Sequence, residues 1–394
     1  MGIRRASYHF AGSLLVLLFL SALAALATER TVDLTAPDGT LLKGTYFSAG
    51  KPGPGVLLLH QCNRERKVWD GLAQQLSAAG LNVLTFDYRG FGESGGEPER
   101  KLTPAQIGAQ RAKWPNDIEA AYRYLVSQPD VNKDVIGVGG ASCGVDNSLQ
   151  LAVRHPEVQS LVLLSGLCNR AGRQYLRDTT SPPAFFAAAD DDEFPGTVTM
   201  IEWQYNIAGN PGKEYVHEKT GNHGTDMFVA HPKLMKQITQ FYVTTLITTP
   251  GHAPVLKSNF KPSEEVKVLS MIDQPGGPAK VEQILEETRK KDSTANLFPE
   301  PLVNLIGYEL LQAGKNQDAV EVMKLNVKAY PNSPNTYDSL ADAYLATGQK
   351  ELARQASNKA LELLPSDTAD PPAQRDAIKA SSEGRLKQLG DAPQ

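Results

Sequence analysis

Residues 135–144 read Val-Ile-Gly-Val-Gly-Gly-Ala-Ser-Cys-Gly, and this short stretch decides the fold. An apolar run with the length of a buried strand passes directly into Gly-x-Ser-x-Gly, and a helical pattern begins at residue 143. A strand, a sharp turn and a helix are the context in which this motif exposes a serine nucleophile, and glycine relieves the crowding two residues before and after that serine. The stretch, called the elbow below (residues 140–144), therefore predicts that Ser142 is a nucleophile.

The sequence on either side of the elbow alternates short apolar runs with helical patterns. The runs after residue 55 are mostly continuous, as in strands buried on both faces of a parallel sheet. We therefore expect an α/β sheet with helices on both faces, in a domain that spans residues 28–248. The expected strands are 31–36, 41–47, 56–60, 83–87, 135–139, 158–165, 184–189 and 214–218, and the expected helices lie near 67–79, 115–128, 143–154, 197–207 and 232–246.

Three segments besides the elbow carry a family resemblance. They read Leu-Leu-Leu-His at 57–60, Phe-Asp-Tyr-Arg-Gly-Phe-Gly-Glu-Ser-Gly-Gly at 86–96 and Gly-Asn-His-Gly at 221–224. With them, residues 40–247 resemble the dienelactone-hydrolase and serine-aminopeptidase-like branches of the α/β-hydrolase superfamily. The resemblance implies acyl transfer through a serine, with the catalytic groups in the chain order Ser, acid, His.

The sequence departs from that family at two positions. Gln61 stands where a Gly or Glu usually follows the histidine, and Ser142 replaces the cysteine nucleophile of true dienelactone hydrolases. Cleavage of their particular lactone is therefore not expected. The insertion at residues 167–183 is too short for a large cap, which favours an open pocket.

The resemblance places the general base and its acid in the loops after the last two strands. His223 lies between glycines after strand 214–218, in a loop that can reach across the sheet to Ser142. The strand at 184–189 ends in Asp190-Asp191-Asp192, and one of these carboxylates is expected to orient the histidine. We choose Asp192, because family members often place the acid three residues after a small strand-end residue, and keep Asp191 as the alternative.

Two backbone N–H groups are expected to form an oxyanion hole. One belongs to Cys143, the residue after the nucleophile, and the symmetry of the two glycines about Ser142 argues against Cys143 as the nucleophile itself. The second is expected from the loop after the first buried strand, where we choose Gln61 and keep Cys62 as the alternative. His60 is expected to be structural.

Beyond a Pro-rich linker at residues 249–262, the chain becomes helical to residue 394. Segments 301–334 and 335–368 align at a period of 34 residues, with Gly314 on Gly348, Ala319 on Ala353 and Pro331 on Pro365. This pattern resembles the tetratricopeptide repeat and predicts a small helical-repeat domain at 263–394, flanked by helices near 279–291 and 372–389. We expect the sheet to close its own hydrophobic layers before the linker.

The first 27 residues have the pattern of a signal peptide. Arg4 and Arg5 precede an uncharged apolar run at residues 10–27, which ends in Ala25-Leu26-Ala27. Small residues at the −3 and −1 positions predict cleavage after Ala27 and export to the periplasm or the medium. The alternative is an uncleaved membrane anchor. No stable membrane span is expected after cleavage.

Composition limits the remaining possibilities. A net charge of −4 without a long basic run argues against nucleic-acid binding, and the cysteine spacing matches no metal site, so no cofactor or metal is expected. Cys62 and Cys168 both follow buried strands at the carboxyl edge of the sheet, and an oxidising compartment favours a bridge between them. Unpaired thiols packed beneath loops are the alternative.

The sequence thus predicts an exported serine hydrolase that cleaves a carboxylic ester, thioester or amide of a small molecule or peptide. The alternative is a repeat protein that binds a peptide or protein partner through residues 301–368 and carries an auxiliary hydrolase fold. The ordered set of Ser142, Asp192 and His223 favours the enzyme, because a retired hydrolase has no reason to keep it.

Overall fold

The computed structural model describes residues 28–255 and 260–390, so the expected signal peptide lies outside the described residues. None of the helices within these two ranges is both long and apolar enough to cross a lipid bilayer. The sheet contains β1 (Thr28–Thr35), β2 (Leu41–Ser48), β3 (Gly53–Leu59), β4 (Asn82–Phe86), β5 (Val131–Ala141), β6 (Val158–Leu164), β7 (Ala184–Ala189) and β8 (Lys213–Glu218).

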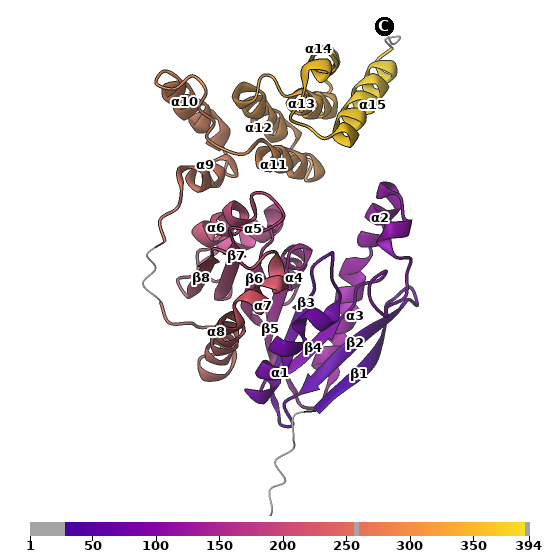
Figure 1. The fold of residues 1–394 in the computed structure, drawn as a ribbon, viewed down its shortest axis with the longest axis vertical. Helices are drawn as coiled ribbons and strands as arrows, with labels where there is room; N and C mark the ends of the chain where they lie inside the picture. Colours follow the sequence, from indigo (N-terminus) through magenta and orange to yellow (C-terminus); the bar gives the residue numbers. More distant parts are fainter. Residues whose placement is uncertain (1–27, 256–259, 391–394) are drawn as a thin grey trace, which may run out of the picture.

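The eight strands form one sheet in the order β1-β2-β4-β3-β5-β6-β7-β8 (Figure 1). The pairs β1–β2 and β2–β4 are antiparallel, and all other pairs are parallel. The carboxyl ends of β3 to β8 therefore lie along one edge, where the loops that follow them meet. All eight strands were predicted from the sequence, because each is a short run bounded by turn signals.

Helices cover both faces of the sheet, as the continuous apolar strands predicted. Leu72 of α1 and Ile238 of α8 pack in the core of one face, and Ile118 of α3, Leu149 of α4 and Ile201 of α6 pack in the core of the other. These helices are α1 (Asp70–Ala78), α3 (Trp114–Ser127), α4 (Cys143–Arg154), α6 (Thr197–Ile207), the short α7 (Met227–Ala230) and α8 (Pro232–Tyr242), which continues as a π-helical turn at Val243–Thr248.

Besides the single turn of α7, the sequence analysis missed three helices. They are α2 (Pro104–Arg111), α5 (Arg170–Arg177) and α9 (Glu264–Ile272). The first two are short and mostly polar, so they lack the apolar periodicity that marks a longer helix. A side-chain cap starts α5 instead, where Asn169 accepts a hydrogen bond from the Gly172 N–H.

The C-terminal part is entirely helical within its described residues. Two helix pairs in it begin 34 residues apart, at Glu300 and Pro334, as the repeat predicted. Gly314 and Gly348 end the first helix of each pair with φ of 70° and 74°, a left-handed conformation that favours glycine. The helices are α10 (Gly277–Arg289), α11 (Glu300–Gln312), α12 (Asn316–Ala329), α13 (Pro334–Ala346), α14 (Lys350–Leu363) and α15 (Pro372–Gln388).

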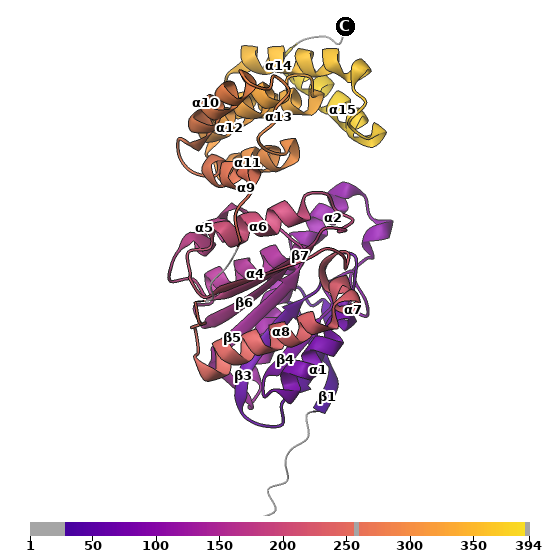
Figure 2. The ribbon, with the colours of Figure 1, turned by 60° about the vertical axis from the view of Figure 1, so that its left-hand side comes forward.

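The helical part lies against α5 and α6 (Figure 2). Trp203 and Ile207 of α6 pack in the same apolar core as α9 and α11. Arg173 of α5, fully buried, forms ion pairs with Asp273 and Glu309 of the helical part. The outer face of α6 is therefore covered by the helical part, whereas the sequence led us to expect that the sheet and its helices would bury their apolar residues without it. The residue pattern of α6 does not reveal which segment covers this face.

Candidate active site

The elbow has the geometry that its sequence predicts. Ser142 lies between the end of β5 and the start of α4 with φ 54° and ψ −121°, a backbone conformation rare for a residue with a side chain. A Cβ on Gly140 would lie 2.0 Å from the Gly144 carbonyl oxygen, and a Cβ on Gly144 would lie 2.4 Å from the Leu59 carbonyl oxygen. Both positions therefore require glycine. Strain of this kind is typical of functional sites.

His223 and Asp192 form a buried pair. The Nδ1 atom of His223 lies 2.8 and 2.9 Å from the two carboxylate oxygens of Asp192, and both side chains are almost fully buried. An ionised carboxylate only accepts hydrogen bonds, so Nδ1 carries a hydrogen and Nε2 is left as the basic nitrogen. That Nε2 is buried and has no hydrogen-bond partner among the described residues.

The loop that carries His223, called the histidine loop below (residues 219–226), packs against the elbow. A Cβ on Gly224 would lie 3.3 Å from the Cβ of Ala141, the residue before Ser142. The same Cβ would lie 2.3 Å from Oε1 of Gln61, so Gly224 is required for this approach. Gly224, the residue after His223, thus brings the histidine loop against the residue before Ser142.

The three adjacent aspartates have three different partners. Asp190 pairs with His217, and Asp192 pairs with His223. The carboxylate of Asp191 accepts hydrogen bonds from the backbone N–H groups of Gly221 and Asn222, at 3.1 and 2.9 Å. The geometry therefore favours Asp192 over Asp191 as the partner of the imidazole.

His60 is buried and structural. Its Nε2 accepts a hydrogen bond from the Tyr88 N–H at 3.1 Å, so Nδ1 carries the hydrogen and donates to the Gln61 carbonyl at 2.8 Å. Burial lowers the pKa of His60 to about 4, which keeps the imidazole neutral at physiological pH. His60 therefore fixes the first peptide of the loop that follows β3, called the oxyanion loop below (residues 60–65).

Gln61 has a second feature that the sequence analysis missed. Its side chain is fully buried, and its Oε1 accepts hydrogen bonds from the N–H and the hydroxyl of Thr225, both at 2.9 Å. Its Nε2 donates to the carbonyl of His223 at 3.4 Å. The oxyanion loop is thereby attached to the histidine loop. The sequence carried one sign of this role, because Gln61 replaces the Gly or Glu that usually follows the histidine in the family that the chain resembles.

The backbone N–H groups of the predicted oxyanion hole belong to two neighbouring segments. Cys143 is the first residue of α4, and the N–H groups of a helix's first turn have no partner within the helix. The Gln61 carbonyl faces His60, and the described residues contain no cis peptide bond. The Cys62 N–H therefore points away from His60, because the two groups of a trans peptide point in opposite directions.

A disulfide joins these two segments. Cys62 and Cys143 are bridged, with their Cα atoms 5.9 Å apart. The predicted bridge between Cys62 and Cys168 is wrong: Cys168 is a free, buried thiol packed on α5 at Gly172. The reason lies in the strand order, since Cys143 follows β5, the direct neighbour of β3, whereas Cys168 follows β6, one strand farther away.

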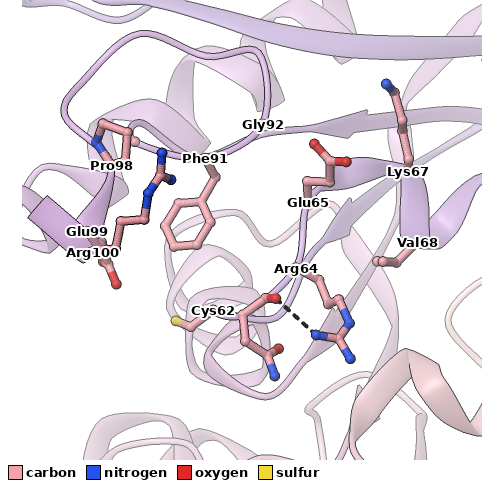
Figure 3. A pocket seen from close by; sticks show the side chains of 12 residues that line it. Cys62, Arg64, Glu65, Lys67, Val68, Phe91, Gly92, Pro98, Glu99 and Arg100 are labelled. Atoms are coloured by element: carbon pink, nitrogen blue, oxygen red, sulfur yellow. Dashed lines mark hydrogen bonds between the residues drawn. The ribbon is translucent and has the colours of Figure 1, made fainter.

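A pocket of about 700 Å³ opens beside the oxyanion loop. In Figure 3, Phe91 and Arg100 lie on one side of this pocket, and Arg64, Glu65 and Lys67 lie on the other. The pocket also reaches Cys62, one half of the disulfide. Arg64 pairs with Asp226, whose carboxylate is thus engaged outside the His223–Asp192 pair.

The residues that the structure describes contain no group of three His, Cys, Asp or Glu side chains that could hold a metal ion. The histidine loop, which packs against the elbow, instead carries the imidazole that pairs with Asp192.

Comparison with curated proteins finds relatives that match part of this chain. The chain is 35% identical over 147 residues to an uncharacterized protein of Mycobacterium tuberculosis (strain H37Rv), covering 37% of this chain and 48% of that protein. It is 25% identical over 186 residues to the thiohydrolase aneE of Aspergillus aculeatus, covering 44% of this chain and 56% of the relative. The chain thus spans about half the length of these curated relatives.

Two solved structures are similar to part of this chain at low sequence identity. The esterase Pf2001 of Pyrococcus furiosus is 20% identical, with a TM-score of 0.43 over 55% of this chain and 92% of its own. A dienelactone hydrolase of Anabaena variabilis is also 20% identical, with a TM-score of 0.45 over 56% of this chain and 99% of its own. The family model described as alpha/beta hydrolase fold matches residues 54–255, just over half of the 394-residue chain. The chain therefore belongs to the α/β hydrolase fold family.

Proposed function

We propose that this protein is a serine hydrolase that cleaves a carboxylic ester, thioester or amide by acyl transfer through Ser142. The observation that carries the proposal is the buried pair of His223 and Asp192, whose free Nε2 belongs to a loop packed on the elbow. A basic imidazole nitrogen beside a strained, glycine-flanked serine is the arrangement that activates a serine hydroxyl.

The residues act in a defined order. His223 takes the proton of the Ser142 hydroxyl as the oxygen attacks the carbonyl carbon of the substrate, and Asp192 stabilises the imidazolium that forms. The developing oxyanion binds the N–H of Cys143 and an N–H of the oxyanion loop, that of Gln61 or of Cys62. His223 then protonates the leaving group, and water, activated by the same imidazole, releases the acyl group from Ser142.

Two observations support the choice of substrate class. The pocket of about 700 Å³ beside Cys62 is lined by charged side chains together with Val68, Phe91 and Pro98, which supports a substrate of modest size with polar groups or the end of a peptide. The relative from Aspergillus aculeatus is named a thiohydrolase, which supports a thioester beside the ester and the amide. An acyl-transfer site accepts all three, since each presents a carbonyl carbon with a leaving group.

Export is part of the proposal. A disulfide between Cys62 and Cys143 persists in oxidising compartments such as the periplasm or the medium. The signal-peptide pattern of residues 1–27 supports the same location.

A second candidate function concerns the helical part. We propose that residues 28–248 form the hydrolase domain, and that 263–394 form a tetratricopeptide-like domain that binds a peptide or protein. A pocket of about 670 Å³ at the ends of the two helix pairs favours such binding. It is lined by Glu300, Asp367 and Asp370, and the buried Oδ2 of Asp367 has no hydrogen-bond partner among the described residues.

The test of the enzyme uses a fluorophosphonate probe and p-nitrophenyl esters of graded acyl length, with thioesters and aminoacyl anilides alongside. Ser142→Ala is expected to abolish labelling and to lower kcat by about 10⁶, the usual effect of losing a serine nucleophile. An unchanged thermal unfolding midpoint shows that the variant is folded. Labelling that persists in Ser142→Ala would contradict the proposal, and so would a wild-type protein that neither reacts with the probe nor cleaves any substrate.

A further inference from the structure

The Cys62–Cys143 disulfide lies where the two halves of the oxyanion hole meet. Cys143 is the residue after Ser142, and Cys62 belongs to the oxyanion loop. The bridge therefore joins, by a covalent bond, the two backbone segments whose N–H groups face the developing oxyanion in the proposed mechanism. A disulfide elsewhere in the sheet would have no such relationship to the reaction.

The other contacts of the oxyanion loop do not attach it to the elbow in this way. Residues up to Gln61 are held by buried hydrogen bonds to Tyr88, which follows β4, and to the histidine loop. Beyond Cys62, Asn63 and Arg64 are exposed and contact Glu193 and Asp226. Surface pairs of this kind contribute little rigidity. The disulfide is therefore the covalent attachment of residue 62 to the segment that carries the proposed nucleophile.

The reaction is sensitive to this spacing. A misplacement of about 1 Å in an active site can cost about 10² in rate, and loss of one oxyanion donor costs about 10²–10³. These contacts strengthen in the transition state, so a change in their spacing lowers kcat more than it raises KM.

We propose that the Cys62–Cys143 disulfide is a positioning element of the oxyanion hole, so that full activity requires the oxidised protein. The inference rests on the proposed function, since it needs acyl transfer at Ser142. Both cysteines act through the backbone N–H groups that they carry or adjoin, and neither sulfur touches the reacting atoms.

The bridge is accessible to a reductant. Both cysteines are partly exposed, and Cys62 lines the pocket of about 700 Å³. A dithiol can attack one sulfur as the thiolate and break the S–S bond, and its second thiol then displaces the mixed disulfide. Two electrons pass from the dithiol to the bridge, leaving the reductant as a cyclic disulfide and both cysteines as thiols.

The experiment compares the double variant Cys62→Ala/Cys143→Ala with the wild type and with Cys168→Ala, which removes the one cysteine outside the bridge. We expect kcat for a p-nitrophenyl ester to fall about 10- to 100-fold in the double variant, with KM changed less than about threefold, because the spacing of the donors is lost. Cys168→Ala is expected to keep the wild-type kcat. A double variant that is folded by circular dichroism and keeps the wild-type kcat would overturn the inference.

Reduction of the unaltered chain tests the same point if the double variant does not fold. Dithiothreitol is expected to lower kcat by the same factor in wild type and in Cys168→Ala, and reoxidation is expected to restore it. Thiol counts on denatured Cys168→Ala protein should rise from none to two on reduction. Reduced protein that keeps the full kcat contradicts the inference while leaving the Ser142 proposal intact. A wild type without any Ser142-dependent hydrolysis instead removes the proposed function and this inference with it.

Discussion

Gln61 and Thr225 join two loops that are far apart in the sequence. The Oε1 atom of Gln61 accepts hydrogen bonds from both the N–H and the hydroxyl of Thr225, which lies two residues after His223. Both residues are buried. Thr225 thereby holds the histidine loop against the oxyanion loop. The same glutamine is followed by Cys62, which is bonded to the residue after Ser142. Residues 61 and 62 thus contact both sides of the proposed reaction centre.

Gln61→Ala is expected to lower both stability and activity. It leaves the buried N–H of Thr225 without its acceptor, which costs about 1–3 kcal/mol of unfolding free energy. The histidine loop loses its attachment, so kcat is expected to fall about 10-fold or more, in line with the effect of a small misplacement. Urea unfolding and ester hydrolysis measure the two effects. Gln74→Ala, which changes an exposed glutamine of α1, is the matched control, and equal behaviour of the two variants would contradict the role of Gln61.

Asp192→Asn and Asp191→Asn are expected to separate two roles that adjacent carboxylates have. Asp192→Asn replaces the acceptor of His223 Nδ1 by a group that can present N–H instead, and the wrong tautomer lowers kcat by about 10³–10⁴. Asp191→Asn retains a side-chain oxygen that can accept a hydrogen bond from the N–H of Gly221 or Asn222. We therefore expect kcat to fall less than about 10-fold, because the histidine loop is displaced only slightly. The measurement is kcat/KM for one ester. The opposite order of effects would move the acid to Asp191.

Much of the fold could be predicted from the sequence because its signals are local. The strands β3 to β7 each contain a short apolar run, and the elbow shows its strand, turn and helix within ten residues. What covers α6 is not a local property. Trp203 could be assigned to a helix, but the residues that bury it come from α9 and α11, which begin more than 60 residues later.

The candidate site also combines features with a local sequence signal and features that depend on tertiary contacts. Glycines identified the elbow and the histidine loop, because a crowded or left-handed backbone leaves a trace in the sequence. The pairing of Cys62 with Cys143 left no such trace. It depends on β3 and β5 being neighbours in the sheet, and the spacing of cysteines along the chain does not report this. The hydrogen bonds of Gln61 to the histidine loop depend on the same tertiary arrangement.

The lowered pKa of His60 predicts that the folded protein loses stability in mild acid. Burial lowers its pKa in the folded protein to about 4, below the ordinary value of 6.5, so the unfolded chain binds more protons between these two pH values. Its contribution is fully present above pH 6.5 and is lost as the pH falls through 4, by up to about 3 kcal/mol at 1.36 kcal/mol for each pKa unit. Thermal unfolding of wild type and His60→Gln over this range measures it. The variant's midpoint should depend less on pH, and parallel curves would contradict the assignment.

Asp273 holds the junction between the sheet and the helical part. Its carboxylate is fully buried and contacts Arg170, Arg173 and Arg177 of α5, of which Arg173 also pairs with Glu309 and lies on the ring of Trp203. Three guanidinium groups around one buried carboxylate are stable only while that carboxylate stays charged, since an unpaired buried charge is costly.

Asp273→Asn is therefore expected to destabilise the whole protein by about 3–5 kcal/mol, because it leaves the buried Arg173 with Glu309 alone. Asp33→Asn is the matched control, since Asp33 pairs with Lys43 at an exposed site and its loss should cost less than about 1 kcal/mol. A fragment of residues 28–255 should also be less stable than the full chain and prone to aggregate. In this fragment Trp203 and Ile207 become exposed, and Arg173 loses the carboxylates of both Asp273 and Glu309.

Urea unfolding of the two variants and light scattering of the fragment measure these effects. A soluble fragment with the full chain's midpoint, together with an Asp273→Asn variant as stable as Asp33→Asn, would show that the sheet and the helical part are energetically independent.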